Sequence, residues 1–164
     1  MRLIRSFIIA FSTYSKIPMP HVDWSEENKR YSMCFFPLIG AAVGLVLAAW
    51  LWICKLLDIG AFLRGSIAAI LSLIVTGGIH MDGFMDTMDA MASWQTRERR
   101  LEILKDSHTG AFAVIGCALY LLASAGLYSE LNSIWPMLCV FVISRCLSAL
   151  ALNHLPKANP GGML

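Results

Sequence analysis

The run Phe35–Cys54, FFPLIGAAVGLVLAAWLWIC, has twenty consecutive residues without a charged side chain. A helix of about twenty apolar residues is long enough to cross the hydrocarbon core of a bilayer. Three further apolar runs follow: Gly65–Ile79, which Ala61–Leu63 extend if Arg64 reaches the interface, Gly110–Tyr128 and Ile134–Leu152. The sequence therefore predicts about four transmembrane helices.

The composition points to the same class of protein. Hydrophobic residues make up 57% of the 164 residues and charged residues only 15%, and the mean hydropathy is +0.64. A soluble domain carries about a quarter charged residues, and a chain of this length cannot bury so much apolar surface alone. One run taken singly, above all the shorter second one, is also compatible with a buried helix of a soluble protein. Together the four predict an all-α, polytopic membrane helix bundle that forms a single membrane domain over 1–164.

The N-terminal stretch Met1–Tyr14 has Arg2 and Arg5 ahead of the short apolar segment Phe7–Phe11. A cleaved signal peptide has a longer apolar region and a cleavage site with small residues, which Lys16-Ile17-Pro18 does not provide. We expect an amphipathic helix that lies in the membrane interface.

The distribution of basic residues predicts the orientation in the membrane. With the N-terminus in the cytoplasm, four spans place 1–34, 82–109 and 153–164 inside. Ten of the thirteen Lys and Arg residues then lie inside: Arg2, Arg5, Lys16, Lys29, Arg30, Arg97, Arg99, Arg100, Lys105 and Lys157. Only Lys55 and Arg64 lie near the outside, so the positive-inside rule favours this orientation.

Two other kinds of site are not supported by the sequence. The five cysteines form no C-x-x-C pair and lie in or beside apolar runs, so they do not indicate a zinc or disulfide framework. No basic tract is present, and we therefore expect no nucleic-acid partner.

A pair of glycines in the first apolar run has the spacing of a helix-packing motif. Gly40 and Gly44 form G-x-x-x-G, which allows two helix backbones to approach closely. Ordinary membrane composition explains the pair equally well at this stage.

Three acidic residues follow the second apolar run at helical spacing. Asp82, Asp86 and Asp89 stand at i, i+4 and i+7, so on a helix they share a sector of about 60°. Two like charges about 6 Å apart cost roughly 0.7 kcal/mol in water and roughly 3 kcal/mol at an effective dielectric of 20. A divalent cation relieves this repulsion, and a few carboxylates with room for water and phosphate suit Mg²⁺. The alternatives are a solvated helix end and a capping cluster.

Other polar residues lie close to this acidic face in the sequence. His80 points away from Asp82 on a continuous helix, but a break at Gly77-Gly78 allows it to turn towards the same site. The stretch Asp106-Ser107-His108-Thr109-Gly110 precedes the third run and predicts either plain helix capping or a phosphate-binding helix N-terminus assisted by Lys105.

One basic residue lies within the fourth apolar run. Arg145 is about seven residues from the cytoplasmic end of that run, which is farther than its side chain easily reaches. Ser144 and Ser148 make this face more polar. We expect Arg145 to face a cavity and to pair with an aspartate or a substrate phosphate.

The acidic stretch resembles a known family signature. Gly77-Gly78-Ile79-His80-Met81-Asp82-Gly83-Phe84-Met85-Asp86-Thr87-Met88-Asp89 is similar to the G-G-x-H-x-D-G-x-x-D-x-x-D motif of the cobalamin synthases, which are adenosylcobinamide-GDP ribazoletransferases. The similarity extends to Phe36-Pro37-Leu38-Ile39-Gly40 with Gly44, Glu102–Ser107 with Gly110, Ile17–Pro20, and Ser144-Arg145. It covers nearly the whole chain, with departures at Ala90, where glycine is common, and at His108, where arginine is common.

The resemblance implies a Mg²⁺-dependent enzyme in a bacterial or archaeal cytoplasmic membrane. It implies that α-ribazole or its 5′-phosphate is joined to adenosylcobinamide-GDP and that GMP leaves. Asp82, Asp86 and Asp89 are then the catalytic and metal-binding residues. The residues expected to bind substrate are His80, Lys105, Asp106, Ser107 and Arg145. Family members usually continue through further membrane segments, so we expect the domain to be incomplete at its C-terminus.

Two other functions remain as alternatives. A CDP-alcohol phosphotransferase also uses an acidic site at the membrane surface, but its D-G-x-x-A-R motif needs Ala-Arg where this chain has Met85-Asp86. A divalent-cation transporter is expected to place acidic groups near the midplane of several spans. The sequence leaves the oligomeric state open, with a homo-oligomer as one alternative.

Overall fold

The computed structural model describes residues 2–155, and these residues form helices without any strand. In chain order the elements are α1 (Arg2–Tyr14), α2 (Glu26–Lys29), the 3₁₀ helix η1 (Ser32–Phe35), α3 (Phe36–Leu56), α4 (Ala61–Thr76), α5 (Ile79–Ala92), α6 (Arg97–Ile103), α7 (Ala111–Glu130) and α8 (Trp135–His154). The predicted all-α fold is confirmed. Lys157, used above for the orientation, lies outside the described residues.

Three helical stretches in the described part of the chain are long and apolar enough to cross a membrane. They are Glu26–Leu56, α7 and α8, and a bent pair formed by α4 and α5 supplies a fourth if it counts as one span. Within this pair α4 is apolar, whereas α5 carries three carboxylates. We therefore place only α4 in the membrane.

The second span ends earlier than the sequence predicts. It was expected to reach Ile79, but α4 ends at Thr76 and α5 leaves at an angle of 98°. Gly77 (φ 64°) and Gly78 (φ 77°) form the corner in the left-handed region, which costs a glycine little. The Gly77 and Gly78 N–H groups donate to the carbonyls of Ile74 and Leu73, so the last turn of α4 keeps its hydrogen bonds.

The segment that follows α1 contacts this corner through Lys16. The backbone N–H of Lys16 donates to the carbonyl of Val75 over 2.8 Å, and the Lys16 alkyl chain covers Gly77 so closely that a Cβ there has no room. The amphipathic helix expected before it is present as α1. Ile9, Ala10 and Phe11 of α1 are buried, while Leu3 and Ile4 are exposed.

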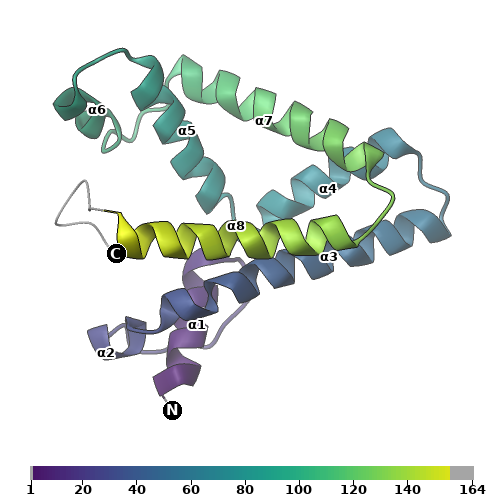
Figure 1. The fold of residues 1–164 in the computed structure, drawn as a ribbon, viewed down its shortest axis with the longest axis horizontal. Helices are drawn as coiled ribbons and strands as arrows, with labels where there is room; N and C mark the ends of the chain where they lie inside the picture. Colours follow the sequence, from purple (N-terminus) through teal and green to yellow (C-terminus); the bar gives the residue numbers. More distant parts are fainter. Residues whose placement is uncertain (1, 156–164) are drawn as a thin grey trace.

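The other helices pack in pairs. Helix α3 runs along α8, α4 runs along α7, and α5 packs against α7 (Figure 1). The apolar core between them includes Val43, Leu47 and Ala68 together with Met137 and Phe141 of α8. The outward surfaces of the spans are also apolar, with Phe62 82% exposed and Leu122 72% exposed. Lipid contact explains such surfaces on a helix bundle.

The glycine motif of α3 lies at its contact with α8. A Cβ on Gly40 overlaps the carbonyl oxygen of Phe141, and one on Gly44 comes within 3.0 Å of the Leu138 Cα. The two glycines therefore act in helix packing, and composition alone does not account for them.

Replacing Gly40 tests this contact. We expect Gly40→Ala to destabilise the bundle by about 2 kcal/mol, because the new methyl group forces the α8 backbone away. Gly126→Ala in α7 is the matched control, since a Cβ there meets nothing within 4 Å. Thermal unfolding in one detergent measures both variants. Equal melting temperatures for Gly40→Ala and Gly126→Ala would contradict the packing role.

Candidate functional site

Helix α5 presents two different polar faces directly after the corner. His80 lies in its first turn and Asp82 two residues later, so the two side chains project from nearly opposite sides of the helix. His80 lines a cavity inside the bundle, and Asp82 lines a shallow hollow beside Gly77 and Gly78 on the outer side of the corner. One of our expectations was that the break at Gly77-Gly78 turns His80 towards the acidic face. The structure does not show this, because His80 and Asp82 line different spaces.

The cavity has a volume of about 380 Å³ and lies among α3, α4, α5, α7 and α8. Polar side chains enter it from several helices: His80, Tyr120, Ser144, Arg145 and Ser148. Ser72 and Thr76 also line it, but their hydroxyl groups donate to backbone carbonyls of α4. The cavity is therefore polar at the level where α4 ends.

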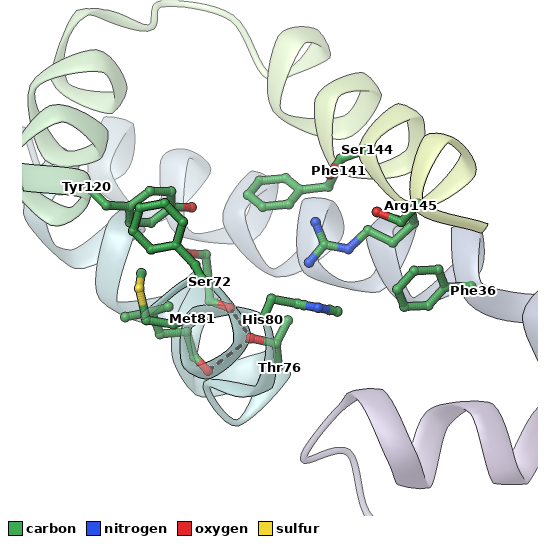
Figure 2. Close-up of a pocket in the computed structure, with 12 residues that line it drawn as sticks. Phe36, Ser72, Thr76, His80, Met81, Tyr120, Phe141, Ser144 and Arg145 are labelled. Atoms are coloured by element: carbon green, nitrogen blue, oxygen red, sulfur yellow. Dashed lines mark hydrogen bonds between the residues drawn. The ribbon is translucent and has the colours of Figure 1, made fainter. Parts of the chain in front are cut away.

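Arg145 supplies the positive charge of this cavity. Its residue is only 9% exposed, and its guanidinium carbon lies 5.4 Å from the centre of the Phe141 ring. Figure 2 shows the guanidinium group pointing into the space above His80. The predicted cavity-facing position is confirmed. The expected pairing with an aspartate is not formed, because the ion pairs of the described residues all involve other side chains.

Two buried nitrogen atoms in this cavity have no hydrogen-bond partner among residues 2–155, Nε of Arg145 and Nε2 of His80. Burial and the nearby Arg145 charge lower the pKa of His80 to about 4, so its imidazole is neutral at pH 7. Among the described residues that line the cavity, Arg145 is then the one charged side chain. A buried positive charge without a counter-ion is costly, and an anion relieves that cost.

The acidic face of α5 is partly exposed. Asp82 is exposed, while Asp86 and Asp89 are half-buried. Burial and the neighbouring carboxylates Asp82 and Asp89 raise the pKa of Asp86 above its usual range. The neighbouring carboxylates thus add to burial in disfavouring the ionised form of Asp86.

Asp89 caps the start of α7. Its Oδ2 accepts a hydrogen bond from the Gly110 N–H over 2.6 Å, and its Oδ1 accepts one from the Ala113 N–H over 2.8 Å. A Cβ on Gly110 falls 2.7 Å from the Asp89 Oδ1, so glycine permits this approach. We expected the N-terminus of α7 to be capped by nearby residues or to bind phosphate. Instead, two of its N–H groups donate hydrogen bonds to Asp89, which is distant in the sequence.

The donors on α5 can be compared with what Mg²⁺ requires. No group of three or more His, Cys, Asp or Glu side chains within 2–155 is gathered closely enough to hold a metal ion. Asp82 and Asp86 nevertheless offer hard oxygen ligands one helical turn apart. Mg²⁺ sites in proteins often use only one or two carboxylates and leave the other positions to water and substrate phosphate. The pair fits such a site, and ligation by Asp89 stays a prediction.

The connection between α6 and α7 stands apart from both sites. Lys105, Asp106 and Ser107 are exposed, and none of them lines the cavity or the Asp82 hollow. Asp106 instead accepts hydrogen bonds from its neighbour His108, at 3.0 Å from the backbone N and 2.6 Å from Nδ1. The structure does not bring these three residues together with His80 and Arg145.

Tyr120 is a cavity residue that our sequence analysis missed. It extends from α7 towards the cavity, and its ring packs 5.7 Å from that of Phe84 (Figure 2). A hydroxyl-bearing residue within an apolar run is a signal for such a position, but it is weak because Tyr also occurs at membrane interfaces.

The apolar spans, the acidic helix and the buried arginine define a multi-pass membrane protein with a polar site at the corner of a broken helix. Residues 6–164 match the family model of cobalamin-5-phosphate synthase. The chain belongs to this family.

Curated relatives are adenosylcobinamide-GDP ribazoletransferases. The protein of Lachnoclostridium phytofermentans is 45% identical over 166 residues, which cover 100% of this chain and 64% of the relative. That of Desulfitobacterium hafniense is 35% identical over 172 residues, 99% of this chain and 66% of the relative. This chain thus spans slightly less than two thirds of the length of these relatives. No solved structure matches it.

The Asp89 cap can be tested by its removal. We expect Asp89→Ala to cost about 1 kcal/mol, the usual value of an N-cap, and to speed amide exchange at Gly110 and Ala113. Hydrogen exchange in chelator measures this without any metal contribution. Asp82→Ala serves as the control because Asp82 bonds to neither amide. Unchanged exchange in Asp89→Ala would contradict the cap.

The Asp106–His108 pair makes a prediction about pH. The hydrogen bond that Asp106 accepts from the His108 ring raises the pKa of His108 above its ordinary value of 6.5 and lowers the pKa of Asp106. The contact is thus complete between the two pKa values: it is lost as the pH rises through the pKa of His108, and also as the pH falls through the pKa of Asp106. An NMR titration should show His108 titrating above 6.5 and returning towards it in Asp106→Asn. Identical curves in both proteins would show that the pair does not form.

Proposed function

We propose that this chain is the site-bearing part of a Mg²⁺-dependent membrane transferase. The enzyme would join α-ribazole, or its 5′-phosphate, to adenosylcobinamide-GDP with release of GMP. Family membership and the names of the relatives support this activity. The structural observation that carries it is the acidic face of α5, exposed at the corner next to a cavity with an unpaired arginine.

Asp82 and Asp86 are the residues proposed to hold the metal ion. A Mg²⁺ ion held there would neutralise phosphate charge and polarise the phosphorus under attack. Asp82 and Asp86 would hold this ion, and one of the acidic residues would accept the proton of the attacking hydroxyl. A bond forms between that hydroxyl oxygen and the cobinamide-linked phosphorus. The bond from this phosphorus to the oxygen of GMP breaks, and GMP leaves.

Asp89 positions the acidic face in this proposal. Its two hydrogen bonds tie α5 to the start of α7 and so fix how α5 presents Asp82 and Asp86. Each oxygen of Asp89 keeps a second lone pair, so the cap is compatible with the predicted ligand role.

The predicted substrate-binding residues divide into two groups. Arg145 and His80 line the cavity and offer donors to an anionic group. Lys105, Asp106 and Ser107 lie on the exposed connection after α6, where they can contact only parts of a substrate that extend beyond both sites. We also propose that the N-terminus and the acidic face are cytoplasmic, as the positive-inside rule predicts.

Substitution of the carboxylates tests the proposal. We expect Asp82→Asn and Asp86→Asn each to reduce turnover of adenosylcobinamide-GDP roughly 100-fold or more, because each removes a metal ligand or a base. Membrane insertion and melting temperature should stay unchanged. Glu98→Gln, an exposed acid on α6, is the control.

The assay follows GMP release in Mg²⁺ and in chelator. It uses this chain and a version extended by the C-terminal segments of a relative. Wild-type rates in both aspartate variants would exclude the metal site. Release of GMP at the same rate in chelator would exclude Mg²⁺.

A further inference from the structure

A separate hollow of about 310 Å³ lies in the segment that joins α1 to α2. Its lining residues belong neither to the Arg145 cavity nor to the Asp82 hollow. We call it the N-terminal hollow, and its polar and aromatic lining residues are Ser12, Ser15, Lys16, His21 and Trp24. Its volume is at the lower end for a small-molecule site.

Hydrogen bonds hold the segment around this hollow at both ends. The buried Ser15 hydroxyl donates to the carbonyl of Phe11 and accepts from the N–H of Ile17. At the other end, the side chain of the buried Asn28 donates to the carbonyl of Asp23 over 2.9 Å. The shape of the hollow is therefore fixed by the chain itself, as is usual for small-molecule sites.

Lys16 stands between the N-terminal hollow and the Asp82 hollow. It lines the first, and its Cγ, Cδ and Cε lie against Gly77, which lines the second. The Lys16 N–H donates to the carbonyl of Val75, so the start of this side chain is fixed as well. One ligand can thus occupy the N-terminal hollow and extend past Lys16 to the acidic face.

The charges at the acidic face leave room for a further cation. A pyrophosphate between two esters carries one negative charge on each phosphate, and Asp82 and Asp86 add one each. A single Mg²⁺ offsets only half of this charge. The side chain of Lys16 is exposed and takes part in none of the ion pairs among residues 2–155, so its ammonium group is available to a phosphate.

The need for a cation increases as the nucleotide leaves. When the bond from the cobinamide-linked phosphorus breaks, its electron pair stays on the oxygen of GMP. The phosphate of GMP then changes from one negative charge to about two, the usual charge of a phosphomonoester at pH 7. A cation at this phosphate therefore stabilises the transition state more than the bound substrate.

We propose that the N-terminal hollow binds the nucleoside part of the leaving nucleotide and that Lys16 binds its phosphate and favours its departure. Trp24 and His21 offer planar rings to a base, and Trp24 is 46% exposed. The inference rests on the proposed function, in which GMP is the leaving nucleotide. An anionic lipid headgroup shares the phosphate chemistry and is the competing occupant.

Binding of the product tests the assignment without turnover. The full chain is placed in phosphatidylcholine nanodiscs with Mg²⁺, and calorimetry measures the affinity for GMP and for guanosine. We expect Lys16→Met to weaken GMP binding about tenfold, because a charged hydrogen bond is lost. The affinity for guanosine should stay within about twofold, since methionine still covers Gly77.

Three further variants sharpen the comparison. Lys16→Arg keeps the charge and should retain most of the GMP affinity. Trp24→Ala should weaken GMP and guanosine alike, because it removes a ring that both ligands contact. Lys55→Met is the matched control, since Lys55 is an exposed lysine at the end of α3 that lines neither hollow. Its affinities should equal those of the wild type.

A measurement on the unaltered protein covers the case in which Lys16→Met does not fold. An acetylating reagent modifies accessible lysines, and peptide mass spectrometry locates the product. GMP should slow the modification of Lys16 and leave that of Lys55 unchanged. Equal modification of Lys16 with and without GMP would overturn the assignment.

The remaining outcomes separate this proposal from its rivals. Equal GMP affinity of Lys16→Met and the wild type overturns the Lys16 contact and leaves the transferase untouched. Protection of Lys16 that requires phosphatidylglycerol in the bilayer, whether or not GMP is added, overturns it in favour of a lipid headgroup. Lys16-dependent binding of GMP without GMP release from the donor supports the site and counts against the transferase.

Discussion

The structure depends on the change of direction at Gly77 and Gly78. An α4 helix that continued straight would carry Asp82, Asp86 and Asp89 progressively farther from the bundle along its own axis, at about 1.5 Å per residue. Two residues in the left-handed conformation end α4 after Thr76 and send α5 away at 98°. The helix that carries the carboxylates thereby packs against α7, and His80 lines the cavity within the bundle.

The direction of α5 is held from both ends. Near its start, the backbone of Lys16 bonds to Val75, and the Lys16 side chain covers Gly77. Near its other end, Asp89 bonds two N–H groups at the start of α7. Packing against apolar neighbours alone fixes a helix less exactly than such directed hydrogen bonds do. The positions of Asp82 and Asp86 thus follow from contacts with segments distant in the sequence.

The sequence predicted those features that depend on local pattern. The apolar runs predicted the membrane-spanning helices, and the G-x-x-x-G motif predicted a close helix contact, which α3 makes with α8. The position of Arg145 within an apolar run predicted that its side chain faces a cavity. The capping of α7 by Asp89 was not predicted, because the two partners are separated by 21 residues and any acid on α5 has the same local pattern. The exposed position of Lys105 and the contribution of Tyr120 likewise depend on how helices pack in three dimensions.

The pairing of helices has a mechanical consequence for the cavity. Arg145 belongs to the α3–α8 pair, whose backbones touch at Gly40, whereas His80 and Tyr120 belong to α5 and α7 on the other side. Glycine contacts bring the backbones of the first pair close together, and the Asp89 hydrogen bonds tie α5 to α7. Any molecule that touches Arg145 and His80 together therefore bridges the two groups of helices.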